Sequence, residues 1–151
     1  MDLSKEYIQM CDCPEIQDNW ELKAGDCFKI IKGKYYIGEP CEGGSEYFEG
    51  DICYADEQSL SYDFSNNIFL WLPRQDQLQE MLGETHSVRP ISLVGFLHQV
   101  LNEDLTCTEE VPCNGCVEEA KYWRSFGSME KLWLAFVMKE KFNKAWDGKW
   151  L

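Results

Sequence analysis

The sequence predicts an α+β fold, in which a small antiparallel sheet of three to four strands within residues 26–72 is followed by packed helices. Short runs rich in β-branched and aromatic residues, bounded by Gly, Pro, Asn and Asp, occur only in the first half of the chain. From Pro73 onward, apolar residues recur at helical spacing instead. The 151 residues include six Trp, eight Phe and seven Tyr, so we expect one domain with a substantial hydrophobic core.

The first expected element is a short helix from Asp2 to Cys11. Either Asp2 or Ser4 can cap its free backbone amides, because both side chains carry an oxygen that accepts a hydrogen bond. Pro14 is expected to end the helix. The apolar side of the helix is formed by Leu3, Tyr7, Ile8 and Met10.

Extended structure is expected from Cys27 onward. Residues 27–31 and 34–38 flank the dipeptide Lys32-Gly33, a pattern that predicts a β-hairpin. Residues 39–50 are rich in Gly and Glu and are predicted to form a loop. Two more strands are expected, separated by a polar turn region, at residues 51–55 and 68–72.

The second half of the chain is predicted to be helical. The expected helices run from Pro73 to about Leu82, from Pro90 to Leu101, from Cys116 to Ser125, and from the N-cap Ser128 to about Lys144. The last of them carries a stripe of apolar residues at helical spacing, which is typical of a helix that faces the core. The stripe consists of Met129, Leu132, Trp133, Phe136 and Val137.

The formal net charge of −13 is unevenly distributed along the chain. Residues 1–84 carry 18 Asp and Glu against 6 Lys and Arg, whereas residues 85–151 carry 9 against 8. No Lys or Arg occurs in residues 35–73. Such a surface repels nucleic acid and attracts basic protein grooves, although the same acidity can serve solubility alone. The candidate partner-binding residues are Glu39, Glu42, Glu46, Glu49, Asp51, Asp56 and Glu57.

The chain is expected to be cytoplasmic and to have no contact with membranes. Its longest uninterrupted apolar stretch, residues 132–138, is far shorter than the ~20 residues that cross a bilayer. The first residues lack the pattern of a secretory signal. In a reducing cytoplasm, the eight cysteines are expected to serve metal binding, redox chemistry or burial and not a disulfide framework.

A zinc knuckle is predicted in the loop between the C-terminal helices. Cys113 and Cys116 are separated by two residues, so both thiolates can bind one tetrahedral ion where the backbone turns tightly. Gly115 permits that turn, and a helix that begins at Cys116 would stabilise its thiolate. The expected Zn²⁺ ligands are Cys107, Cys113, Cys116 and His98. The alternatives for the fourth ligand are His86 and the pair Cys11 and Cys13.

Other chemistries for the cysteine motif are less favoured. A redox dithiol usually follows a β-strand, whereas Cys113 follows a polar loop that is expected to lie between helices. A catalytic zinc would need an open coordination position and a nearby acid or base, for which Glu109 and Glu110 are candidates. No GxSxG, HExxH or glycine-rich phosphate-binding motif is present, so we do not expect an enzyme.

Several long and unusual strings stand out in the chain: residues 70–82 (LWLPRQDQLQEML), 129–142 (MEKLWLAFVMKEKF), 146–148, 6–11 and 15–17. These strings resemble a family of small phage and prophage proteins of Gram-positive bacteria. The resemblance covers somewhat less than a third of the chain, and the family has no assigned reaction. The cysteine loop at 105–116 and the acidic region at 39–63 depart from the family pattern, so a specialised role is expected there.

This resemblance implies a protein that acts in the cytoplasm of a bacterial host. Small acidic phage proteins of such hosts often inhibit host defence nucleases, and anti-CRISPR proteins are the best-known class. We therefore expect a zinc-stabilised, monomeric inhibitor that binds the basic surface of a host nucleic-acid-handling protein, most specifically a CRISPR effector nuclease. The alternatives are a phage structural or replication accessory protein and a zinc-dependent hydrolase.

Overall fold

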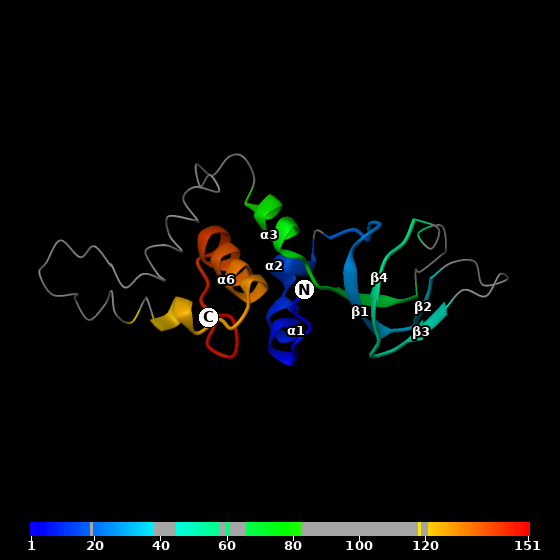
Figure 1. Ribbon diagram of the computed structural model, residues 1–151, viewed down its shortest axis with the longest axis horizontal. Helices are drawn as coiled ribbons and strands as arrows, with labels where there is room; N and C mark the ends of the chain where they lie inside the picture. Colours follow the sequence, from blue (N-terminus) through cyan, green and yellow to red (C-terminus); the bar gives the residue numbers. More distant parts are fainter. Residues whose placement is uncertain (19, 38–44, 58–59, 61–65, 83–117, 119–120) are drawn as a thin grey trace, which may run out of the picture.

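A computed structural model describes residues 1–18, 20–37, 45–57, 60, 66–82, 118 and 121–151. The fold is α+β, with a small antiparallel sheet as predicted, and Figure 1 shows the strands gathered on one side of the molecule and the helices on the other. The elements are α1 (Lys5–Cys11), α2 (Pro14–Gln17), β1 (Cys27–Lys32), β2 (Lys34–Ile37), β3 (Ser45–Phe48), β4 (Ile52–Tyr54), β5 (Ile68–Trp71), α3 (Gln75–Met81) and α6 (Met129–Phe142).

The strands form two separate ladders. β1 lies in the centre of a three-stranded antiparallel sheet with the order β4-β1-β5, whereas β2 pairs only with β3. The predicted hairpin between residues 27–31 and 34–38 is therefore wrong, since β4 and β5 occupy both edges of β1. The predicted loop at 39–50 also needs correction, because Ser45–Phe48 forms β3 against β2.

Gly33 directs the chain out of the first ladder and into the second. Its φ is +96°, and a Cβ at this position would lie 1.9 Å from Oδ1 of Asn67. The Asn67 amide nitrogen donates to the carbonyl oxygen of Lys34 at 2.7 Å, so the space that glycine leaves is used to hold the chain beyond the turn. Between Ile30 and Lys32 the register of β1 against β5 also shifts, which marks a bulge beside the turn.

Aromatic packing connects the two ladders. The ring of Tyr35 in β2 meets that of Phe28 in β1 edge-on, with centroids 4.8 Å apart, and that of Phe69 in β5 at 5.8 Å. Phe28, Ile30 and Tyr35 are fully buried. Edge-to-face pairs of this kind contribute stability in addition to that of the apolar area they bury. The two ladders are therefore joined by side-chain packing.

Helix α6 is the centre of the larger hydrophobic cluster. All seven residues from 132 to 138 are buried, so the helix is surrounded and not simply amphipathic. It packs against α1 and α3. The Ser128 side chain caps its first turn as predicted, by accepting from the amide of Lys131, and Asn143 ends it with a left-handed φ of 53°. Met129 of the predicted core stripe is instead exposed.

The N-terminal segment attaches to this helical core. The predicted cap is confirmed, since Ser4 Oγ accepts from the amide of Tyr7 at 3.2 Å. The buried hydroxyl of Tyr7 donates to the carbonyl oxygen of Pro73, between β5 and α3. Helix α1 ends at Cys11, before Pro14 as predicted, and Pro14 is the first residue of α2.

No helix among the described residues is long and apolar enough to cross a membrane. The expected helix at residues 90–101 lies outside the described residues, whereas residues 121–124 are helical, within the span expected for the third helix.

We predict that Gly33→Ala destabilises the protein by about 2–3 kcal/mol, because alanine is strained at this φ and its Cβ would displace the Asn67 side chain. Urea unfolding followed by circular dichroism measures this. Gly50→Ala is the matched control: its φ is +97°, but nothing lies within 4 Å of the added Cβ. A cost of about 1 kcal/mol is expected there from the positive φ alone, and equal costs for the two variants would contradict a role for the Asn67 contact.

Candidate interaction site

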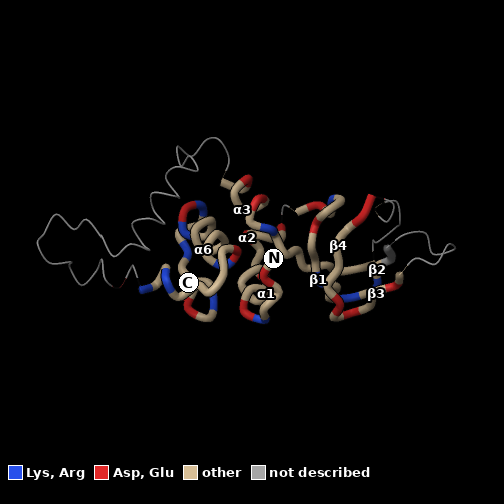
Figure 2. The backbone as a smooth tube through the Cα atoms, in the orientation of Figure 1, with Lys and Arg blue, Asp and Glu red and all other residues tan. Residues whose placement is uncertain are grey.

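The predicted acidic surface is divided between the two ends of β4. Glu46, Glu49 and Asp51 lie in or beside the β3–β4 turn, whereas Asp56 and Glu57 follow the other end of the strand. Figure 2 shows acidic positions (red) at both the upper and the lower edge of the sheet side of the molecule. Asp51 and Asp56 are five positions apart in the sequence, which in extended chain is a span of roughly 17 Å. Glu39 and Glu42 lie outside the described residues. The described carboxylates therefore do not form one continuous patch.

Only some of these carboxylates are available to a partner. Glu46 forms an ion pair with Lys34 at 2.7 Å, and Asp51 Oδ2 accepts from the amide of Phe48 at 2.8 Å, which stabilises the turn. Glu49 and Glu57 are exposed, and their carboxylates have no ion pair or hydrogen bond with any other described residue. These two are the best-placed members of the predicted set.

The predicted zinc ligands Cys107, Cys113, Cys116 and His98, and the alternative His86, lie outside the described residues. In the part of the chain that is described, no three His, Cys, Asp or Glu side chains are grouped as metal ligands.

The remaining alternatives for the fourth ligand, Cys11 and Cys13, are buried in the helical core. Burial raises the pKa of Cys11 well above its ordinary value and that of Cys13 to about 11. Both thiols therefore lose their proton less readily than an exposed cysteine does, and a cysteine must lose that proton to bind a metal ion.

A cleft of about 500 Å³ lies where α2, α3 and the C-terminal end of α6 approach the end of β5. In Figure 1, α2 and α3 occupy the junction between the helical side and the sheet side of the molecule. Sequence analysis did not identify this site, because its residues come from four separate segments. They are Glu15, Ile16, Trp20, Glu21, Lys23, Asp26, Trp71, Gln77, Glu80, Met81, Lys141 and Phe142.

Two stacked indoles form one wall of the cleft. The rings of Trp20 and Trp71 are nearly parallel, with 5° between their planes and 5.8 Å between their centroids. Gln17 holds the backbone of Trp71 from both sides: its Oε1 accepts from the Trp71 amide at 2.9 Å, and its Nε2 donates to the Trp71 carbonyl at 3.1 Å. Trp71 is 8% exposed, and its indole Nε1 has no hydrogen-bond partner among the described residues.

Asp26 fixes the base of the cleft. Its side chain is 3% exposed and accepts hydrogen bonds from Trp20 Nε1 at 2.8 Å, from the Lys23 amide at 2.9 Å and from Gln77 Nε2 at 2.5 Å. Its backbone carbonyl accepts from the amide of Ala55, which follows β4. One residue therefore joins the stacked indoles, helix α3 and the sheet.

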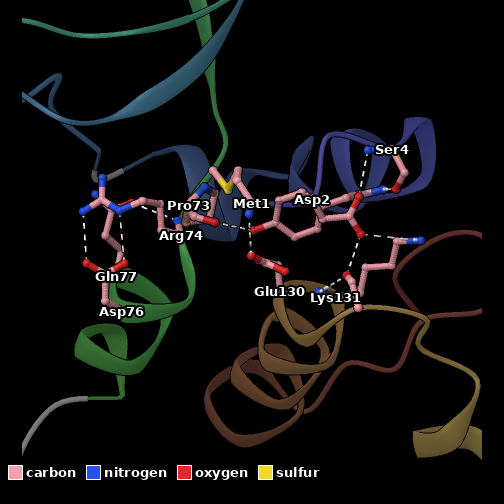
Figure 3. Close-up of polar contacts among 11 residues, drawn as sticks. Met1, Asp2, Ser4, Pro73, Arg74, Asp76, Gln77, Glu130 and Lys131 are labelled. Atoms are coloured by element: carbon pink, nitrogen blue, oxygen red, sulfur yellow. Dashed lines mark hydrogen bonds and ion pairs between the residues drawn. The ribbon is translucent and has the colours of Figure 1, made fainter.

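Arg74 reinforces this junction from the N-cap of α3. Its guanidinium donates to the carbonyl oxygen of Gly25 and pairs with Asp76 at 3.0 Å, a contact that Figure 3 shows. The hydrogen bond from Arg74 lowers the pKa of Asp76 below its ordinary value. The Gln77 side chain accepts from the Arg74 amide at 2.9 Å, which satisfies the backbone donor at the N-cap of the helix.

Some of the charged side chains around the cleft have partners, and others do not. Glu15 pairs with Lys144, whose hydrogen bond lowers the pKa of that carboxyl, and Lys141 donates to the carbonyl oxygen of Met81 at 2.8 Å. Glu21 and Glu80 are exposed, with carboxylates that bind no other described residue. In the sequence, Trp20 is an aromatic residue within a polar segment, and this is the feature that could have indicated the site.

Comparisons with models of known protein families, with characterised proteins and with solved structures gave no significant match.

We predict that Asp26→Asn destabilises the protein by about 2 kcal/mol, because the new amide group would direct its hydrogens at donors that now bind the carboxylate. Urea unfolding gives the free energy, and near-ultraviolet circular dichroism reports the environment of the stacked indoles. Asp18→Asn, at an exposed position, is the control and should change neither. Equal stability of the two variants would refute the role of Asp26.

Proposed function

We propose that the protein is an acidic, zinc-binding interaction protein of phage origin that inhibits a host nucleic-acid-handling enzyme, most specifically a CRISPR effector nuclease. The observation that carries this proposal is the charge distribution: the net charge is −13, and residues 35–73 contain no Lys or Arg. The resemblance of residues 70–82 and 129–142 to small phage proteins supports the proposed source.

The proposed mechanism is electrostatic competition. An enzyme that holds nucleic acid binds phosphates with grooves of Lys and Arg, so a rigid acidic surface can occupy the same grooves. Glu49 and Glu57 support this proposal, because both are exposed and neither is neutralised by a described basic residue. Glu46 supports it less well, since Lys34 already pairs with it.

Zinc has a structural part in this proposal. Cys107, Cys113, Cys116 and His98 together match the donor set of a closed tetrahedral site, in which all four ligands come from the protein. Metal binding of this kind adds to the free energy of folding, because the unfolded chain does not hold the ligands together. The proposed zinc would therefore stabilise the folded protein.

We predict about one zinc ion per chain in protein prepared without chelators, and loss of that zinc with a lower melting temperature in Cys113→Ser. Elemental analysis and thermal melts measure the two quantities. Cys53→Ser is the control: Cys53 is buried in the sheet core, so that variant should lose stability but keep its zinc. Parent protein without zinc would exclude the proposed site.

We predict that the double variant Glu49→Lys and Glu57→Lys binds the nuclease about 100-fold more weakly at low salt, if each carboxylate contributes ~1.5 kcal/mol at the interface. The measurement is inhibition of the purified host CRISPR effector nuclease at two salt concentrations, alongside thermal melts. The parent should also lose affinity as salt rises.

The control for this experiment is Glu140→Lys with Asp147→Lys. Both positions are exposed on the helical side, and the pair changes the net charge by the same amount. Equal loss of inhibition in both double variants would indicate a general charge effect, and full inhibition by Glu49→Lys/Glu57→Lys would exclude these carboxylates from the interface. A parent protein that inhibits no such nuclease would contradict the proposed function itself.

A further inference from the structure

The cleft beside the stacked indoles combines three features that point to a cationic ligand. It is hollow on the scale of small-molecule sites, about 500 Å³. It has an aromatic wall, formed by Trp20 and Trp71. Four of its lining residues are acidic and two are basic, and Lys144 pairs with one of the four, so a small excess of negative charge remains that favours a cation over an anion.

The aromatic wall is rigid. Trp20 is fixed at its indole nitrogen by Asp26, and Trp71 is fixed through its backbone by Gln17. Trp20 is half-buried, so part of its ring remains accessible on the cleft side of the molecule. A preorganised indole attracts a cation through the negative face of its π-system, and Arg does this more often than Lys because its planar guanidinium also stacks.

The carboxylates that remain free are suited to the same ligand. Glu15 and Asp26 are engaged by Lys144 and by internal donors respectively, whereas Glu21 and Glu80 are exposed and bind no other described residue. Two free carboxylates beside an indole can accept hydrogen bonds from the five donors of one guanidinium.

We propose that this cleft binds an arginine side chain of a protein partner. The inference deepens the proposed function, on which it rests for the basic character of that partner, and it adds a specific anchor to a surface that otherwise acts through charge alone. Buried anchors of this type usually contribute more to an interface than the exposed charges around it.

The test is a titration of the intact protein with the peptide Ac-Gly-Gly-Arg-Gly-Gly-NH₂, followed through the indole N–H signals of Trp20 and Trp71 by NMR. These two signals should shift and saturate, with a dissociation constant in the millimolar range that is expected for one side chain. The matched peptide with Lys should bind more weakly. The peptide with citrulline, which has the same shape without the charge, should produce no saturating shift.

Variants locate the site. Glu21→Gln with Glu80→Gln should weaken binding of the arginine peptide about fivefold without lowering the melting temperature, because both carboxylates are exposed. Glu49→Gln with Glu57→Gln removes the same charge at positions that do not line the cleft and should leave the affinity unchanged.

The outcomes separate this inference from the proposed function. Arginine binding that is weakened only in Glu21→Gln/Glu80→Gln supports the cleft, even if no nuclease is inhibited. Unshifted Trp20 and Trp71 signals, equal binding of the citrulline peptide, or equal weakening in both double variants would overturn it, whatever the result of the inhibition assay.

Discussion

Asp26 is the contact on which the arrangement of sheet and helices depends. A carboxylate that is 3% exposed is costly to bury unless its oxygens are bonded, and here three donors from two segments meet that requirement. Because Gln77 belongs to α3 while the Asp26 backbone pairs with Ala55, the same residue sets the position of the helix against the end of the sheet. The cleft lies beside this contact, between α2, α3 and the C-terminal end of α6.

The helical side is organised by a different constraint, the burial of α6. Seven consecutive buried residues cannot be covered by one neighbouring element, so α1, α3 and the C-terminal turn all pack around this helix. Trp150 contributes from that turn, where its indole nitrogen donates to the carbonyl oxygen of Met10 at 2.8 Å. Trp123, Trp133 and Trp146 of the C-terminal half are therefore mainly structural, whereas Trp20 and Trp71 also line the cleft.

The acidic residues of the chain have different roles in this structure. Some carboxylates have internal tasks: Asp51 stabilises a turn, Asp26 joins elements, and Glu46 neutralises a lysine. Among the exposed carboxylates without such tasks, Glu49 and Glu57 lie at the ends of β4, and Glu21 and Glu80 lie around the cleft. A partner would meet diffuse negative charge at the first and a shaped, partly aromatic site at the second, and these differ in what they contribute to binding: charge accelerates encounter, and shape provides specificity.

The sequence by itself determined the fold class, the cap residues Ser4 and Ser128, and the buried helix that begins at Met129, because helical periodicity and capping depend on residues only a few positions apart. The tertiary structure decided which strands pair. Lys32-Gly33 has the composition of a hairpin turn, yet β1 pairs with β4 and β5, since the positive φ of Gly33 and the packing of Tyr35 on Phe28 and Phe69 lead β2 away to β3. It also decided the cleft, whose Glu21 and Glu80 are nearly 60 residues apart in the chain. Contacts of that separation leave no periodic trace, because they depend on how whole elements pack and not on the spacing of neighbouring residues.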